Sequence, residues 1–166
     1  PGVTLDRQGR PQNADGTPAF GLWTPAQLLQ RTTAGSLSGE SVMLSPAHQA
    51  AVERWIVKQK PAPVPVYRGM WMSKEQWADW SARHVTGSEP VRLPALTSFT
   101  ADSQRAAAYG RGGDVFVTLK LPGGRAVDIS QHSVYPQERE ALLQRTIVAR
   151  AGQVTWASPG AANVTL

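Results

Sequence analysis

The stretch SVYPQEREALL, from Ser133 to Leu143, holds two glutamates, Glu138 and Glu140, one residue apart. Local propensity predicts a helix here, because Pro136 suits the first helical position and strong helix formers follow it. In a helix both carboxylates would be solvated beside the positive end of the dipole. In a strand, residues i and i+2 share a face, about 6.5–7 Å apart. Two carboxylates so placed can divide the work of activating a nucleophile and stabilising a cation.

The composition of the whole chain is that of an ordinary globular protein. It has 166 residues, 41% of them hydrophobic, and no apolar run reaches the roughly 18–20 residues of a membrane span. We therefore expect no membrane insertion by this domain. The sequence has no cysteine, which excludes disulfides, thiolate catalysis and cysteine-bound metals.

The length and the first residues indicate how the chain is organised. Its length favours one domain, 1–166, with a linker-like lead-in over 1–20, a helical part over 21–60 and a catalytic sheet core over 61–166. The chain begins with Pro1 rather than Met, and its polar opening does not have the character of a signal peptide. We expect the C-terminal fragment of a larger protein, with targeting information upstream.

The charge of the chain favours an anionic partner. There are 17 basic and 12 acidic residues, a net charge of +5, and all the basic residues except Lys58, Lys60, Lys74 and Lys120 are arginines. Arginine suits bidentate contacts, so nucleic acid, a phosphate-bearing ligand or an acidic inhibitor protein would fit. A basic surface without such a role explains the same charge, because the arginines are scattered along the chain.

Helical patterns occupy the first part of the chain. Helices are expected to begin after Thr24, Ser45 and Ser73, since each is an N-cap residue in front of a helical pattern. Another short helix is expected over 101–110, where Gly110 ends it.

Strand patterns dominate the second part. Extended segments are expected at 64–67 and 91–100. The alternating stretch DVFVTLKLPGGRAVDIS predicts a hairpin that turns at 122–124, and 146–159 predicts strand, turn and strand. The class is therefore α+β with a largely antiparallel sheet.

Three short motifs follow one another along the chain. VYRGM (66–70) puts an arginine in a strand, and LTSFT (96–100) puts a Ser-x-Thr at the end of another. The third motif is YPQERE (135–140). In this order they resemble the arginine, Ser-Thr-Ser and Glu-x-Glu motifs of the mono-ADP-ribosyltransferase toxins, the branch with clostridial binary toxins and bacterial effectors. The resemblance covers about residues 64–158.

Two further matches support the resemblance. The family follows its serine motif with a helix that ends in an aromatic residue, a glycine and a basic residue, as do Tyr109, Gly110 and Arg111. The stretch VDISQHSVYPQEREALL fits the family's approach to its glutamates. The family context favours a strand over a helix at 138–143. It implies an α+β fold, with a helical N-terminal part and two packed antiparallel sheets around an NAD cleft.

The resemblance also implies which residues bind NAD, which is a substrate here. Arg68 would contact phosphate and ribose, and Gly69 would let the backbone bind the nicotinamide amide. Thr100 stands where the family has its last serine. Tyr109 would stack on nicotinamide, and Arg111 lies in a loop that can clamp phosphate. A surface salt bridge, a core tyrosine or a solvated arginine is the ordinary alternative for such residues taken singly.

The catalytic and acceptor residues are implied in the same way. Glu140 matches the glutamate that stabilises positive charge on the ribose, and Ser98 the serine that orients it. Glu138 matches the first glutamate, which in the family accompanies arginine as acceptor. Tyr135 and Gln137, within the acceptor loop 129–137, would face the acceptor. The middle residue, Phe99, replaces the family's usual threonine, and its side chain is expected to point away.

The function implied is a bacterial toxin domain that transfers ADP-ribose from NAD to a macromolecular target and releases nicotinamide. Glu-x-Glu favours protein arginine as the acceptor, and the arginine-rich composition favours RNA as the alternative. A binding module without turnover is a further reading, and so is a nuclease. The histidines show no motif spacing, and we expect no metal.

The resemblance finally implies partners and a location. We expect secretion or delivery by a bacterium and action in the cytoplasm of a target cell. A toxin that harms its producer needs a cognate immunity protein, and an acidic one would complement this surface.

Overall fold

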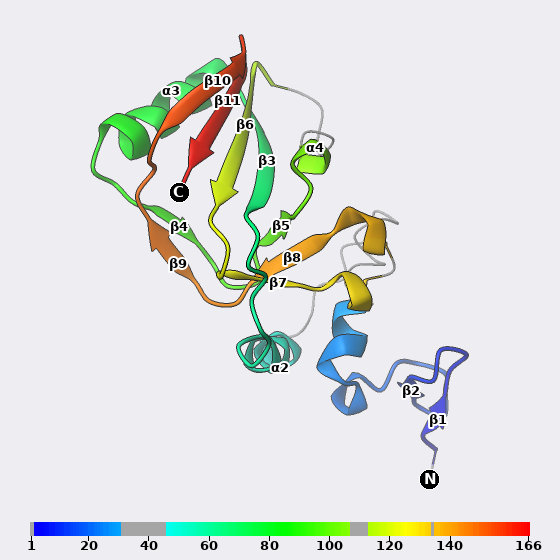
Figure 1. Cartoon of the computed structure of the whole chain (residues 1–166). Coiled ribbons are helices and arrows are strands. Elements are labelled where there is room, and N and C mark those ends of the chain that lie inside the picture. The colour runs from blue at the N-terminus through cyan, green and yellow to red at the C-terminus, as the bar shows by residue number, and fades with distance from the viewer. Residues whose placement is uncertain (1, 31–45, 107–112, 134) are drawn as a thin grey trace.

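The described residues form an α+β fold around one large sheet. The computed structural model describes residues 2–30, 46–106, 113–133 and 135–166 (Figure 1). The large sheet has seven strands, in the order β10 (Val154–Ser158), β11 (Ala161–Thr165), β6 (Val115–Leu121), β3 (Val66–Met72), β5 (Ser98–Thr100), β8 (Glu140–Leu143) and β7 (Ala126–Asp128). Two small sheets pair β4 (Val91–Leu93) with β9 (Ile147–Ala149), and β1 (Thr4–Leu5) with β2 (Pro11–Gln12).

The large sheet narrows where β3 meets β5. Among the described residues these two strands are joined through one residue pair, Tyr67 with Thr100, whereas β3 and β6 pair over the whole of β3. The sheet therefore consists of a four-stranded half and a three-stranded half (Figure 1). The predicted α+β class is confirmed. The two antiparallel sheets that we expected are these joined halves, except that β11 runs parallel to β6.

Alternating side chains of β6 build the core of the four-stranded half. Val115, Val117 and Leu119 are at most 7% exposed, as their alternation predicted. The helix α3 (Lys74–Ser81) packs Trp77 and Trp80 against them. This helix begins at a capping box, since the Ser73 side chain accepts a hydrogen bond from the Gln76 backbone and the Gln76 side chain accepts one from Ser73. The predicted helix after Ser73 is confirmed.

The helical part covers the three-stranded half. Residues 25–30 are helical, and α2 spans Pro46–Ile56. The Thr24 hydroxyl caps the first of these helices by accepting from the Gln27 amide at 3.2 Å. Ser45, the predicted cap of the second, lies outside the described residues. Apolar side chains of both helices form one buried cluster with β7 and β8: Leu28, Leu29, Val52, Ile56, Val127 and Leu142.

The lead-in, residues 1–20, has local structure of its own in the part that the structure describes. Strands β1 and β2 form a small hairpin, and a 3-10 turn, η1 (Phe20–Leu22), follows. Trp23 ties the hairpin to the helical part, because its indole Nε1 donates to the Pro11 carbonyl at 2.7 Å. The Arg10 guanidinium lies 4.7 Å from the Trp23 ring centroid. The predicted single domain with its three divisions, and its origin in a larger protein, stay predictions.

The predicted hairpin at 122–124 is wrong. β6 and β7 are both strands, but β6 pairs with β3 and β11, and β7 pairs with β8. The reason is Ala62, whose carbonyl accepts from Gly124 and whose amide donates to Ala126, each at 2.8 Å. Ala62 thus occupies the place of a hairpin partner. The chain at 122–124 passes from one half of the sheet to the other.

The tail also pairs differently from the prediction. β9 and β10 are the predicted strands, but β9 pairs with β4 and β10 with β11. The last strand, β11, was not predicted. Its alternation of buried and exposed side chains is short, because only Ala162 and Val164 are buried against β6.

Candidate active site

The stretch around the two glutamates is a turn followed by a strand. A 3-10 turn, η4 (Pro136–Glu138), leads to Arg139, which has a left-handed backbone with φ of 48°. The strand β8 begins only at Glu140. The predicted strand is therefore confirmed for 140–143 and wrong for 138 and 139. Glu138 and Glu140 do not share the face of one strand, because Glu138 ends the 3-10 turn and Arg139 has a left-handed rather than an extended backbone.

The end of β5 holds this turn in place. The Thr100 hydroxyl donates to the Glu138 carbonyl at 2.8 Å. The Ala101 amide donates to the Arg139 carbonyl at 3.0 Å. A left-handed conformation at a residue other than glycine is unfavourable and needs such support from its surroundings. The Ser-x-Thr segment thus positions the segment that carries the glutamates.

Ser98 contacts the carboxylate of Glu140 directly. The Ser98 hydroxyl donates to Oε1 of Glu140 at 2.8 Å. The register explains the contact: Thr100 pairs with Glu140 and Ser98 with Leu142, so these side chains lie on one face of adjacent antiparallel strands. Phe99 points to the other face and is 3% exposed in the core. The expectation that Phe99 points away is therefore confirmed.

Burial raises the pKa of the Glu140 carboxyl above its ordinary value. The hydrogen bond from Ser98 acts in the opposite direction, and the charge of Glu138 adds to the rise. The negative charge of Glu138 therefore disfavours ionisation of Glu140. A carboxylate that is poorly solvated and faces a second negative charge has a strong preference for a nearby cation.

Arg68 connects β3 to the same serine. Its Nη1 donates to the Ser98 carbonyl at 2.8 Å. Arg68 is half-buried, and this bond fixes the orientation of its planar guanidinium. Among the described residues the other N–H donors of the group have no partner, so they can bind an anion. The first and second sequence motifs therefore meet at Ser98, and the third joins them through Glu140.

Gly69 allows the helix α4 (Ser103–Ala106) to approach β3. A Cβ at this position would lie 2.1 Å from the Ala106 carbonyl oxygen and 2.6 Å from Cζ of Phe116. No side chain fits there, so the glycine is required for packing. Its predicted contact with nicotinamide stays a prediction.

A cavity opens where β3 and β5 separate. Its volume is about 250 Å³, and it is lined by Tyr67, Arg68, Gly69, Ser98, Phe99 and Thr100. A larger cavity of about 560 Å³ shares Tyr67 and extends over β6, β10 and β11, where Lys120 supplies a positive charge. Together the two are of the size that proteins use for cofactor-sized ligands. The smaller cavity offers the guanidinium of Arg68, the hydroxyls of Ser98 and Thr100, and the ring of Tyr67.

Three solved ADP-ribosyltransferases are similar to this structure. HopU1 of Pseudomonas syringae pv. tomato DC3000 is 21% identical with a TM-score of 0.56, and the match covers 91% of this chain and 65% of HopU1. C3stau2 from S. aureus, solved with NAD, is 18% identical with a TM-score of 0.56, covering 89% and 87%. The Vis toxin of Vibrio splendidus, in complex with agmatine, is 17% identical with a TM-score of 0.53, covering 85% and 65%.

This chain has the ADP-ribosyltransferase fold. The resemblance inferred from the three motifs is confirmed for the fold, and the chain spans about two thirds of the length of HopU1 and of Vis. No protein-family model matches the sequence, and no curated protein matches it either.

The ADP-ribosyltransferase fold brings together three of the predicted site residues, Arg68, Ser98 and Glu140. The Thr100 hydroxyl holds the backbone of a fourth, Glu138, beside the end of β5. Thr100 is near them but is 2% exposed, and its hydroxyl is engaged by Glu138 and by the Asp102 amide. Its observed part is to position the turn, and its contact with NAD stays a prediction. Tyr109 and Arg111 lie outside the described residues.

The two predicted acceptor residues, Tyr135 and Gln137, lie just before Glu138. Tyr135 is half-buried at the start of η4, and Gln137 is exposed within it. The acceptor loop is anchored at its start, where the buried Ile129 donates its amide to the Glu140 carbonyl at 3.0 Å. The predicted contact of Tyr135 and Gln137 with an acceptor is compatible with this placement and stays a prediction.

Sequence reasoning missed two residues of the site. Tyr67 lines both cavities, and its place beside the motif arginine was the available signal. Arg139 supplies the left-handed kink, for which the sequence offers no signal, because arginine rarely adopts this conformation.

Within 2–30, 46–106, 113–133 and 135–166, no cluster of three or more histidine, aspartate or glutamate side chains is arranged to hold a metal ion. None of the helices in these ranges has the length and apolar character of a membrane-spanning helix.

Proposed function

We propose that this domain transfers ADP-ribose from NAD to a macromolecular target and releases nicotinamide. The observation that carries the proposal is the hydrogen bond of Ser98 with Glu140, beside an arginine fixed on the same serine, within an ADP-ribosyltransferase fold. A binding module without turnover would not need a carboxylate that is held half-buried against a second one.

Arg68, Glu140 and Ser98 each have a different role in the reaction. Arg68 holds the pyrophosphate of NAD by charge-assisted hydrogen bonds. As the bond between ribose and nicotinamide breaks, its electron pair leaves with the nicotinamide nitrogen, and positive charge develops on the ribose. Glu140 stabilises that charge, and Ser98 keeps the carboxylate oriented, so little reorganisation accompanies the step.

Protein arginine is one candidate acceptor, and Glu138 supports it. The carboxylate of Glu138 interacts with that of Glu140, and a carboxylate can bind a guanidinium and accept its proton. Agmatine, which was bound to the Vis toxin, ends in such a guanidinium.

RNA is the second candidate, and a different observation favours it. A basic and aromatic surface adjoins the acceptor loop. A carboxylate base takes a proton from a hydroxyl as well as from a guanidinium, so Glu138 is compatible with both acceptors.

The biological setting is part of the proposal. The domain acts as a toxin, delivered by a bacterium into the cytoplasm of a target cell. The description of Vis as a toxin supports this setting. The net charge of +5 supports an acidic immunity protein as partner.

Labelled NAD tests the proposal. The domain and its Glu140→Ala variant are incubated with cell lysate and NAD labelled in the adenylate part. We expect label on macromolecules with the wild type and none with the variant. No label and no released nicotinamide with either protein would refute the proposed function.

A further inference from the structure

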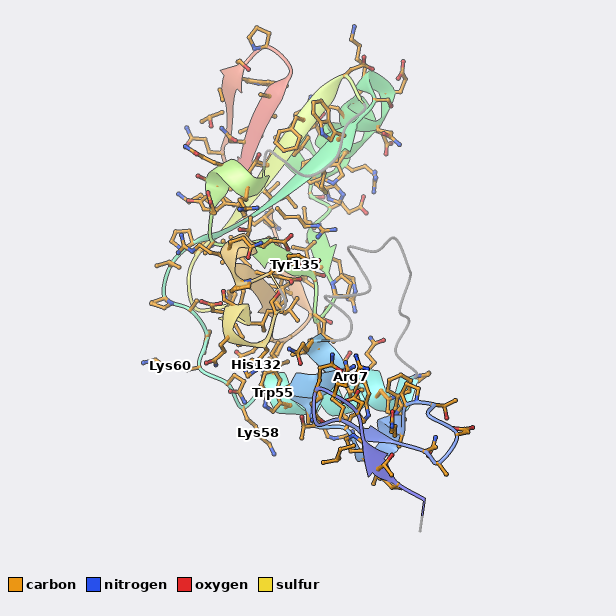
Figure 2. All side chains as sticks on the ribbon, turned by 90° about the vertical axis from the view of Figure 1, so that its right-hand side faces the viewer. Arg7, Trp55, Lys58, Lys60, His132 and Tyr135 are labelled. Atoms are coloured by element: carbon orange, nitrogen blue, oxygen red, sulfur yellow. The ribbon has the colours of Figure 1, made fainter. Side chains whose placement is uncertain are left out.

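A basic and aromatic surface lies beside the acceptor loop. We call the set Trp55, Lys58, Lys60, His132 and Tyr135 the docking surface. Figure 2 shows Tyr135 near mid-height, with His132, Trp55 and the two lysines below it and Arg7 on the lead-in. They come from the end of α2, the turn after it and the acceptor loop.

An aromatic contact joins α2 to the acceptor loop. The rings of Trp55 and His132 meet edge to face, with centroids 5.2 Å apart and planes at 79°. Trp55 comes from the last turn of α2, and His132 ends the 3-10 turn η3 (Ser130–His132). Both residues are half-buried, so each keeps some exposed surface, although Trp55 also packs against the buried cluster of the helical part. Such rings can stack with a planar group of a ligand.

The turn that carries the two lysines is fixed to the strand that carries Glu140. Gln144 immediately follows β8. Its Nε2 donates to the Ile56 carbonyl oxygen at 3.1 Å and also to the carbonyl oxygen of Gln59. These carbonyls belong to the end of α2 and to the turn behind it. The positions of Lys58 and Lys60 are thereby coupled to the candidate active site through one side chain.

The lysines carry charge that is not neutralised within the described part of the chain. Lys58 and Lys60 are exposed, and neither takes part in an ion pair there. Between residues 46 and 60, Arg54 and the two lysines accompany a single acidic residue, Glu53. This part of the surface therefore favours an anionic ligand.

We infer that the docking surface binds single-stranded RNA and presents a ribose hydroxyl to Glu138. This inference rests on the proposed function and names its acceptor. Lysines contact phosphates, and accessible aromatic rings stack with unpaired bases. An acidic protein would satisfy the lysines, but it would not use the rings of Trp55 and His132 in this way.

The transfer step balances without a further reactant. The bond between the ribose of NAD and nicotinamide breaks, and its electron pair leaves on the nicotinamide nitrogen. A lone pair of the RNA hydroxyl oxygen forms the new bond to the same ribose carbon. The hydroxyl proton passes to the carboxylate of Glu138 and then to water.

The experiment uses the whole domain and an RNA of about 20 nucleotides with blocked ends, longer than the roughly 4–16 nucleotides covered by one small domain. The test variant is Lys58→Ala with Lys60→Ala. Its matched control is Lys74→Ala with Arg92→Ala, which removes the same charge from exposed positions on α3 and β4. Both helix α3 and strand β4 lie away from α2 (Figure 1). A DNA of the same sequence lacks internal ribose hydroxyls.

Three readouts are measured: nicotinamide release without acceptor, RNA binding at several salt concentrations, and label transferred to RNA, DNA or lysate protein. We expect label on RNA and not on DNA. The test variant should bind RNA about 10-fold more weakly, with a salt dependence less steep by roughly 1.4 in the log–log slope. Its nicotinamide release should equal that of the wild type, and the control should match the wild type throughout.

A third variant separates stacking from charge. Trp55→Leu should weaken RNA binding at every salt concentration and leave the slope unchanged, since no cation is lost.

Other outcomes overturn one claim or the other. Label on protein alone, or RNA binding unchanged by loss of both lysines, refutes the docking surface while the proposed function stands. Absence of nicotinamide release refutes the proposed function, and the salt dependence of RNA binding then still decides whether the docking surface exists.

Discussion

Ser98 and Glu140 lie 42 residues apart in the sequence, and 2.8 Å separates the Ser98 hydroxyl from Oε1 of the Glu140 carboxylate. The carbonyl of the same serine accepts from Arg68. One residue at the start of a three-residue strand thus connects a guanidinium to a carboxylate. Because the serine is bonded at both its side chain and its backbone, a small change in it should alter the acid–base behaviour of Glu140.

Replacement of Ser98 tests this relationship. Ser98→Ala removes a hydrogen bond that lowers the pKa of Glu140, so that pKa should rise further. The ionised form is then lost at a higher pH. We expect nicotinamide release to fall about 10- to 100-fold, with its acidic limb displaced to higher pH. An unchanged limb in a pH–rate profile would contradict the role of Ser98.

Replacement of Glu138 separates hydrolysis from transfer. Glu138→Gln keeps the size of the side chain and removes a charge that raises the pKa of Glu140. Nicotinamide release should persist, with its acidic limb at lower pH, while transfer to the acceptor falls about 100-fold or more. Both reactions are measured with the same enzyme preparation. Equal loss of both would show that Glu138 has no separate part in transfer.

Glu140 is expected to cost stability at neutral pH. Its folded pKa is raised by burial, so its contribution to stability is fully present below the pKa of the unfolded chain and is lost as pH rises through the folded value. Glu140→Gln should therefore raise the unfolding temperature at neutral pH. The gain should vanish in acid, where the wild-type carboxyl is protonated. Thermal unfolding of both proteins across pH measures this difference, and a gain that is independent of pH would contradict it.

Gly69 is expected to be sensitive to the smallest substitution. Gly69→Ala puts a methyl group 2.1 Å from the Ala106 carbonyl oxygen, which forces α4 away from β3. We expect a loss of about 1–3 kcal/mol in the free energy of unfolding, measured in urea. Gly21→Ala is the matched control, because no atom lies within 4 Å of its added Cβ. Equal effects of the two changes would contradict this packing argument.

Much of the fold could be predicted from patterns within short segments. Caps at Thr24 and Ser73, and the alternation along β6, each depend on neighbours in sequence. The three motifs, taken in order, predicted that Arg68, Ser98 and Glu140 lie together. None of these residues would have been selected alone.

Pairings between distant segments could not be predicted in this way. Ala62 replaces the hairpin partner of residues 122–124, and no local rule connects positions so far apart. At Arg139, helix propensity predicted a helix and family context a strand. The structure has neither, because hydrogen bonds from Thr100 and Ala101 stabilise a left-handed turn.

Nicotinamide release from NAD by the purified domain tests the central claim most directly. Glu140→Gln retains the shape of the side chain and is expected to fold at least as stably, so lost activity cannot be attributed to unfolding. The account predicts release by the wild type and a decrease of about 100-fold or more in the variant. Equal release by both proteins, or none by the folded wild type, would contradict it.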